Sequence, residues 1–333
     1  MISRRRFLTG ALITLAQMGA AAHAQEYKAQ QAGRVYRVGI LRATAPLPMD
    51  QGTDPTLRNA LRELGYVEGQ NLTVEGRYAD GKLDRLPVLA RELVQLRVDV
   101  IVAIGSAAIR AAKEATTTIP IVMYGGFDPV AAGFVASLAR PEGNVTGVVM
   151  GPGSSLTGKR LELLGEAVPR AARVAFLVPD DPNFRPQVEE AQQGAPSLGI
   201  KLVVVEVRAG DYAHAFSTIS AERAAALLVG ATPYFMRDRK RIIDLAAKHR
   251  LPAMYEWPEQ VEDGGLMSYG ATQSALVQRA AAYIDRIFKG ARPGDLPVEQ
   301  PTKFELVINR KTAKALGLTL PPSLLSRADR IIE

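Results

Sequence analysis

Short apolar runs alternate with longer amphipathic segments along most of the chain. In the segments between the runs, apolar positions recur every three and four residues, which is the spacing of a helix that lies on a sheet. Strands that are apolar on both faces indicate a parallel sheet covered by helices on both sides. The first half therefore predicts a doubly wound α/β unit with strands at 35–41, 71–78, 98–105, 119–126 and 144–150.

The second half repeats this order of strands and helices. Leu64-Gly65 precedes the second strand of the first half, and Leu198-Gly199 stands at the same place 134 residues later. Two similar α/β lobes joined by a hinge near 151–155 explain the repeat. The alternative is a chance similarity between two stretches of ordinary α/β sequence. We assign 35–150 and about 271–297 to the first lobe, and 151–270 and about 298–333 to the second. The strands expected in the second half are 172–179, 200–208, 224–231, 251–257 and 264–270.

The first 24 residues have the pattern of an export signal. Three arginines at 4–6 precede an apolar run over about 7–16, and a small-x-small sequence ends at Ala24. The stretch SRRRFL resembles the twin-arginine export motif. We expect cleavage after Ala24 and a periplasmic location; a retained membrane anchor is the alternative, but the apolar run is short for a spanning helix.

Charge and cysteine content narrow the function further. The net charge is +7, but three of the positive charges lie in the predicted signal and the others are dispersed. Nucleic-acid binding needs basic residues gathered on one face, so we expect no nucleic-acid partner. The chain has no cysteine, which excludes disulfides, thiolate chemistry and cysteine-bound metal. We expect a diffusing, monomeric protein.

Motifs for catalysis are missing. The loop AIGSAAI has one glycine, whereas a dinucleotide site needs three, and it lacks the Gly-x-Ser-x-Gly of a nucleophile elbow. His214 and His249 lie in helical patterns with no ligand partner four residues on. Asp180-Asp181 is an acidic pair of a kind common where strands end. We therefore expect no catalytic residue, no metal and no cofactor.

A ligand of open parallel sheets binds beyond the carboxyl ends of the strands, and two facing lobes form a cleft there. Ser106 follows the run 98–105 and begins a helical pattern. Its hydroxyl and the amides of Ala107 and Ala108 at the helix N-terminus favour a carboxylate. Other polar or aromatic residues that follow strands, and that we expect at the ligand, are Thr44, Asp128, Asn183, Tyr234, Tyr255, Glu256, Trp257 and Tyr269.

For an amino-acid-like ligand, Asp128 or Glu256 would pair with the ammonium, because a buried cation needs a counter-charge. Tyr255, Trp257 and Tyr269 would stack on the ligand side chain or enclose it. Several of the expected ligand residues have an alternative role. Asp128 before a proline is an ordinary helix N-cap. Tyr269 would serve equally in packing between lobes, and Tyr234 in the buried first turn of a helix.

The segments 61–81, 99–123, 128–148, 245–270 and 287–333 carry a resemblance to a known family. They resemble the periplasmic substrate-binding proteins of bacterial ABC importers, in the group that includes tryptophan- and tyrosine-type binders, with the type I periplasmic-binding fold. The sequence departs from the pattern at 125–127 and 256–257, which puts ligand identity in doubt.

The resemblance implies capture of a small organic solute, an amino acid or an analogue, by closure of the lobes. The solute would pass to an ABC permease in the inner membrane, whose ATPase partner hydrolyses ATP. A ligand-sensing partner of a membrane receptor and, less favoured, an enzyme on the same scaffold are the alternatives.

Overall fold

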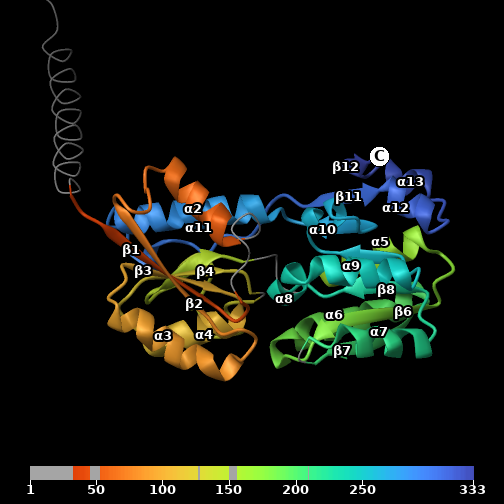
Figure 1. Cartoon of the computed structure of the whole chain (residues 1–333), viewed down its shortest axis with the longest axis horizontal. Helices are drawn as coiled ribbons and strands as arrows, with labels where there is room; N and C mark the ends of the chain where they lie inside the picture. Colours follow the sequence, from red (N-terminus) through yellow and green to blue (C-terminus); the bar gives the residue numbers. More distant parts are fainter. Residues whose placement is uncertain (1–32, 46–52, 127, 150–155, 209) are drawn as a thin grey trace, which may run out of the picture.

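Two α/β lobes lie side by side in the computed structural model, which describes residues 33–45, 53–126, 128–149, 156–208 and 210–333 (Figure 1). The predicted signal, residues 1–24, and the predicted hinge centre at 151–155 lie outside these ranges. Each of the ten strands predicted above is present, so the expectation of two doubly wound sheets is confirmed. Within the described residues no helix is both long and apolar enough to cross a bilayer.

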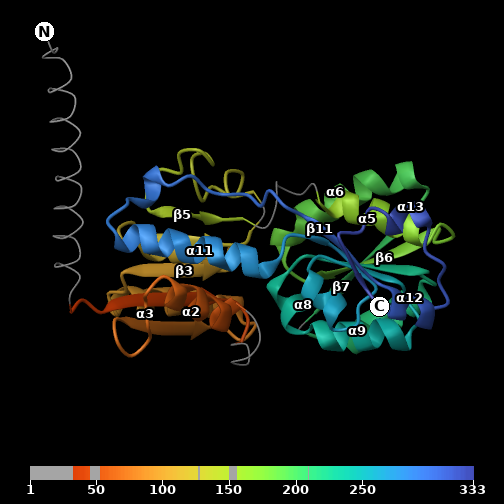
Figure 2. The same ribbon diagram turned by 90° about the horizontal axis from the view of Figure 1, so that it is seen from above.

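The first lobe is built on a five-stranded parallel sheet in the order β2-β1-β3-β4-β5. Helices α3 and α4 cover one face of it, and α2 together with α11, which returns from the second lobe, covers the other (Figure 2). The elements are β1 (Tyr36–Arg42), α2 (Thr53–Glu63), β2 (Leu72–Tyr78), η1 (Leu83–Arg85), α3 (Leu86–Gln95), β3 (Val100–Ile104), α4 (Ser106–Ala115), β4 (Ile121–Tyr124), β5 (Val145–Val148), α11 (Gln273–Phe288) and η4 (Pro293–Asp295).

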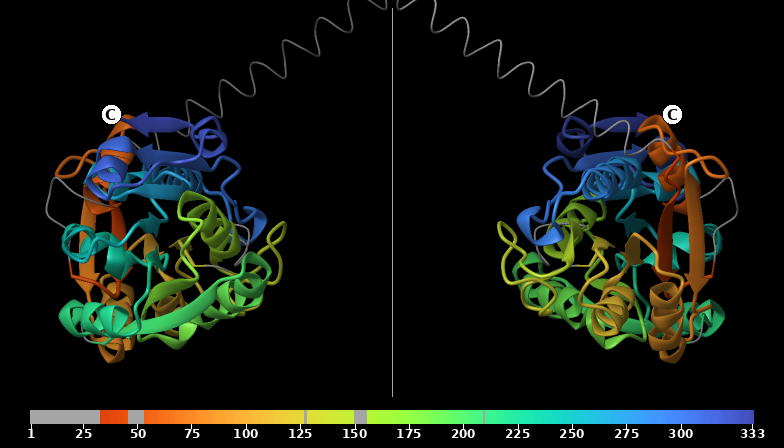
Figure 3. Two further views of the ribbon diagram at one scale, coloured as in Figure 1. Left: turned by 90° about the vertical axis from the view of Figure 1, so that its right-hand side faces the viewer. Right: turned by 90° about the vertical axis from the view of Figure 1, so that its left-hand side faces the viewer.

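The second lobe has a seven-stranded sheet in the order β12-β11-β10-β9-β8-β6-β7, in which β10 and β11 pair antiparallel. The sequence analysis did not predict β11 and β12, which extend the sheet at the edge opposite β7 (Figure 3). The elements are α5 (Leu156–Ala167), β6 (Arg173–Pro179), η2 (Pro182–Phe184), α6 (Arg185–Gly194), η3 (Ala195–Leu198), β7 (Lys201–Val207), α7 (Tyr212–Ala221), β8 (Ala226–Val229), α8 (Pro233–Arg237), α9 (Arg239–Lys248), β9 (Ala253–Tyr255), α10 (Pro258–Glu262), β10 (Met267–Gly270), β11 (Glu305–Asn309), α12 (Arg310–Ala315), α13 (Pro322–Leu325) and β12 (Arg330–Ile332).

Each sheet is buried on both faces, as the apolar runs predict. In β3, Val102 and Ile104 join the core beneath α2 and α11, whereas Ile101 and Ala103 join the core beneath α3 and α4. This alternation follows from the period of two along a strand. Because both faces need apolar side chains, the strand reads as a continuous hydrophobic run. The carboxyl ends of the strands are left free to carry the polar loops.

Candidate functional site

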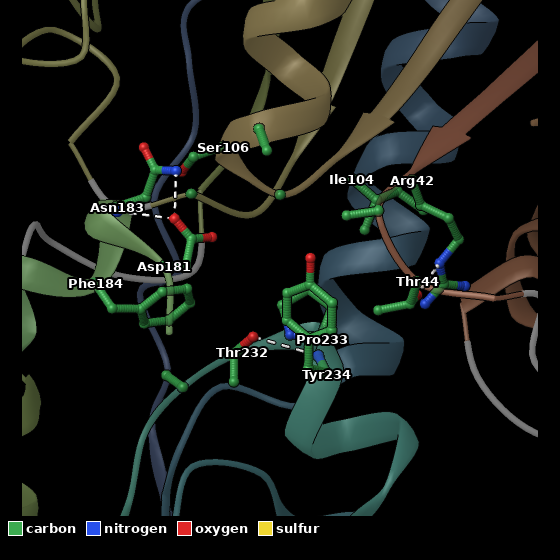
Figure 4. Close-up of a pocket in the computed structure, with 15 residues that line it drawn as sticks. Arg42, Thr44, Ile104, Ser106, Asp181, Asn183, Phe184, Thr232, Pro233 and Tyr234 are labelled. Carbon is green, nitrogen blue, oxygen red and sulfur yellow. Dashed lines mark hydrogen bonds between the residues drawn. The ribbon is translucent and has the colours of Figure 1, made fainter. Parts of the chain in front are cut away.

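A pocket lies between the lobes, where loops that follow β1, β3 and β4 meet loops that follow β6 and β8 (Figure 4). It leaves about 500 Å³ between atoms, its opening to solvent included. The first lobe contributes Arg42, Ala43, Thr44, Ile104, Gly105, Ser106, Ala107 and Gly126, and the second contributes Asp181, Asn183, Phe184, Ala231, Thr232, Pro233 and Tyr234.

The first lobe presents the N-terminus of α4 to the pocket. Gly105 precedes the helix with φ +84° and ψ 157°, a conformation that glycine adopts most readily. It caps the helix without a side chain, so the first amides of α4 are open to a ligand. The Ser106 hydroxyl beside them has no hydrogen-bond partner among the described residues, and Gly126 leaves the space next to it open. This wall suits an anion.

The second lobe presents a carboxylate. Asp181 follows β6, and its Oδ1 accepts hydrogen bonds from the backbone N and the Nδ2 of Asn183 at 2.9 and 2.7 Å. These bonds fix the carboxyl group at the start of η2 as a helix cap. Asp181 was not among the predicted ligand residues, although Asn183 was. The signal that could have found it is an aspartate that precedes a proline directly after a buried strand, as Asp128 precedes Pro129.

Tyr234 stands between these walls. The Thr232 hydroxyl accepts a hydrogen bond from the Tyr234 backbone N at 3.3 Å, and Pro233 opens the first turn of α8. The Tyr234 ring packs against apolar clusters of both lobes. Its phenol oxygen points into the space between Asp181 and Ile104 (Figure 4). Burial, together with the charge of Asp181, raises the pKa of Tyr234 to about 12, so the phenol is neutral at ordinary pH.

Arg42 and Thr44 form the far side of the pocket. Arg42 is 2% exposed at the end of β1, and its Nε donates to Thr44 Oγ1 at 2.9 Å. The hydrogen bond orients both side chains at the carboxyl edge of the first sheet. The pocket therefore has a cationic side chain on the first lobe and an anionic one on the second.

Five of the eleven predicted ligand residues line this pocket, namely Thr44, Ser106, Ala107, Asn183 and Tyr234. Two predicted residues on the first lobe do not. Ala108 is fully buried, because its position in α4 faces the sheet. Asp128 is exposed, and its Oδ1 accepts from the backbone N of Val130 and Ala131 at 3.0 and 2.9 Å. It caps the turn over 129–133, where the sequence analysis gave a helix N-cap as the alternative role.

Four predicted residues of the second lobe also lie outside the pocket. Short helix α10 begins at Pro258, directly after Tyr255, Glu256 and Trp257, and packs against β9. Tyr255 is buried beneath α9 and Trp257 beside Met236, so neither faces the cleft. Tyr269 packs instead against Phe304, with ring centroids 6.1 Å apart.

Glu256 belongs to a buried ion pair. Its Oε1 lies 3.0 Å from Nη2 of Arg160 on α5, and each side chain is 3% exposed. Arg160 Nε also donates to the backbone O of Tyr269 at 2.8 Å. Burial raises the pKa of the Glu256 carboxyl, and the Arg160 guanidinium opposes part of that rise. The pair joins α5 to the ends of β9 and β10, which is a structural role.

The pocket has no cluster that would hold a metal. Among the described residues no three or more His, Cys, Asp or Glu side chains are grouped for a metal ion. His249 shares a hydrogen bond with Ser220 Oγ at 2.9 Å, and His214 is exposed on α7; neither lines the pocket. A pocket lined by both a carboxylate and an open helix N-terminus is suited to binding a small molecule with charges of both signs.

Comparison with known proteins gives this arrangement a family. The family described as ABC transporter substrate binding protein matches residues 49–332. A tyrosine-binding protein of Clostridioides difficile is 26% identical over 260 residues, which cover 78% of this chain and 74% of that protein.

Solved structures agree with that match. A conserved domain protein of Vibrio cholerae is 29% identical and has a TM-score of 0.79, with 90% of this chain and 100% of that chain covered. An ABC domain of Streptococcus pneumoniae in complex with L-Trp is 25% identical and has a TM-score of 0.77, again with 90% of this chain and 100% of that chain covered. With nearly all of its length after residue 48 matched by the family, the chain belongs to the ABC transporter substrate-binding proteins.

Proposed function

We propose that this protein captures a single amino acid between its lobes and delivers it to the permease of an ABC importer. The observation that carries the proposal is that the two lobes contribute groups of opposite polarity to one pocket. The Asp181 carboxylate comes from the second lobe, and the open N-terminus of α4 with Ser106 comes from the first. A zwitterion has one charge for each of them.

The ligand carboxylate would bind the Ser106 hydroxyl and the first amides of α4, including that of Ala107, where the helix dipole favours negative charge. The ligand ammonium would bind Asp181, because an enclosed cation needs a counter-charge. Asp181 takes the role that the sequence analysis gave to Asp128 or Glu256. Ile104, Phe184 and Tyr234 provide apolar surface for the ligand side chain.

The ligand joins groups from both lobes, so binding favours the arrangement in which the lobes are close. A ligand that contacts both walls shifts the population toward that closed form. The permease would recognise the closed form and receive the solute without any chemical change to it. We further propose that the mature chain begins after Ala24 and works as a periplasmic monomer with no cofactor.

Two relatives support an aromatic ligand as the first to test. One is a tyrosine-binding protein, and another was solved with L-Trp. The aromatic and aliphatic lining of the pocket is compatible with either side chain.

Isothermal titration calorimetry of the mature protein with the twenty amino acids tests the proposal. Binding should be strongest among the aromatic amino acids. Asp181→Asn keeps an oxygen for the cap but removes the charge, and it should weaken binding by about 30-fold or more, as truncation of one buried charge partner costs roughly 2–5 kcal/mol. The matched control is Asp180→Asn, because Asp180 is exposed and 3.6 Å from Arg208.

The control variant should bind as the wild type does. Absence of heat with every amino acid would refute the proposed ligand class. Equal affinity of Asp181→Asn and wild type would refute the role of Asp181.

A further inference from the structure

The cleft holds a second cavity next to the pocket. It leaves about 1,000 Å³ between atoms, its opening included. The turn from Asp80 to Leu83 borders it on the first lobe, and the ends of β6 and β7 together with α8 border it on the second. Among the residues that the structure describes, only Asp181 and Tyr234 line both the pocket and this outer cavity. They therefore stand at the boundary between the two spaces.

The Tyr234 ring is held firmly at that boundary. Thr232 caps its turn, and Pro233 fixes the backbone before it. The ring packs on clusters of both lobes, and a Cβ at Gly105 of the first lobe would lie 3.8 Å from Pro233 Cγ, so the lobes approach closely here. A ring wedged between two cores cannot rotate away without losing contacts on both sides.

The outer cavity favours positive charge. Arg237 is neutralised by Asp238, to which its Nε and Nη2 donate at 2.6 Å each, and Tyr212 Oη donates to the same carboxylate at 2.7 Å. Asp80, Asp180 and Lys82 also line the cavity, but Asp80 is paired with Arg85 at 2.9 Å and Asp180 with Arg208 at 3.6 Å. Asp181 is the lining carboxylate with no ion-pair partner among the described residues. An ammonium would be better accommodated there than a carboxylate.

We propose that the Tyr234 ring is the specificity-determining partition that limits the site to single amino acids, and that the cavity beyond it takes the extra residue of an N-terminally extended ligand when the ring is removed. The inference rests on the proposed function, because that function sets the polarity of the ligand. Asp181 borders both spaces, so the amino end of the ligand faces the outer cavity. The carboxylate end faces α4 and Ser106, which line the inner pocket alone.

Calorimetry with three probes tests the partition: L-tyrosine, glycyl-L-tyrosine and L-tyrosylglycine. Wild-type protein should bind tyrosine and neither dipeptide. Tyr234→Ala and Tyr234→Leu should gain affinity for glycyl-L-tyrosine by about tenfold or more over wild type, and neither should bind L-tyrosylglycine. Tyr234→Phe is the matched control, since it keeps the ring and should still exclude both dipeptides.

Tyr234→Ala and Tyr234→Leu are both tested, so that one remains informative if the other fails to fold. Thermal unfolding shows whether each variant is folded. The partition is overturned if wild type binds glycyl-L-tyrosine as tightly as tyrosine. It is overturned too if both folded small variants still exclude this dipeptide, or if Tyr234→Phe admits it. Those results leave the proposed function intact when wild type binds tyrosine. A wild type that binds no amino acid and no dipeptide overturns both proposals.

Discussion

Replacement of Glu256 by glutamine should destabilise the fold and leave ligand affinity unchanged. Glu256 Oε1 lies 3.0 Å from Arg160 Nη2, and each side chain is 3% exposed. Glutamine has nearly the same volume, so the change opens no cavity. It removes the negative charge and leaves the Arg160 guanidinium buried with the Tyr269 carbonyl oxygen as a neutral acceptor. Neither partner of the ion pair lines the pocket, which is why affinity should be unaffected.

The size of the effect follows from the burial of the pair. Loss of one partner of a buried ion pair costs roughly 3–5 kcal/mol, because the remaining charge is desolvated without compensation. The lower value, about 3 kcal/mol, applies here because glutamine still offers an oxygen to Arg160. At roughly 2–4 °C per kcal/mol for a unit of 150–250 residues, Tm should fall by about 6–12 °C.

Urea denaturation and thermal unfolding measure the stability loss, and calorimetry measures affinity on the same samples. Glu333→Gln is the matched control. Its pair with Arg310 is also close, at 2.8 Å, but the side chains are 73% and 55% exposed, so the loss should stay below about 0.5 kcal/mol. The double variant Arg160→Met/Glu256→Leu should recover part of the stability, because both charges of the buried pair are removed together. Recovery should be incomplete, because Glu190 loses the favourable charge of Arg160. Loss of affinity with unchanged stability would refute this reasoning and return Glu256 to the ligand site.

Three further changes test the site and its surroundings. The pKa of Tyr234 is raised to about 12, so the stabilising contribution of its neutral phenol is complete below about pH 10 and is lost as pH rises toward 12. In urea titrations between these pH values, the wild type should therefore lose more stability than Tyr234→Phe. Equal losses in the two proteins would contradict this prediction. Asp128→Ala removes two hydrogen bonds to backbone amides and should cost about 1 kcal/mol in thermal unfolding with no change in calorimetric affinity; a weaker affinity would return it to the ligand site. Gly105→Ala places a side chain at φ +84° and should cost about 1–3 kcal/mol in urea unfolding, and a stability equal to wild type would argue against strain there.

Most strands were predictable because a strand that is buried on both faces is a short, continuous run of apolar residues. β3 needs apolar residues at every position, and Val100 to Ile104 supply them without reference to the rest of the chain. The open N-terminus of α4 was equally local, since Gly105-Ser106 stands between a buried strand and an amphipathic helix. The sequence analysis did not predict β11 and β12, although they belong to the same seven-stranded sheet as the predicted strands of the second lobe.

Five of the eleven predicted ligand residues line the pocket, because the sequence shows where a strand ends. It does not show whether another element packs over that strand end. Tyr255 and Trp257 stand at a strand end as the pocket residues do, yet Tyr255 is buried beneath α9 and Trp257 beside Met236 of α8. Asp128 and Asp181 are similar in sequence, each an aspartate before a proline at a strand end. Asp181 lines the pocket, whereas Asp128 lies past the pocket-lining part of the β4 loop and is exposed, and the sequence does not distinguish the two positions.

The sequence by itself determined the ten strands from β1 to β10, the helices that cover them and the open N-terminus of α4, since each depends on the periodicity and chemistry of a few neighbouring residues. The tertiary structure alone decided which polar strand ends meet across the cleft, that Glu256 pairs with Arg160, and that Tyr234 divides two cavities. These contacts join residues far apart in the chain, and their geometry depends on how two lobes and a short covering helix pack together.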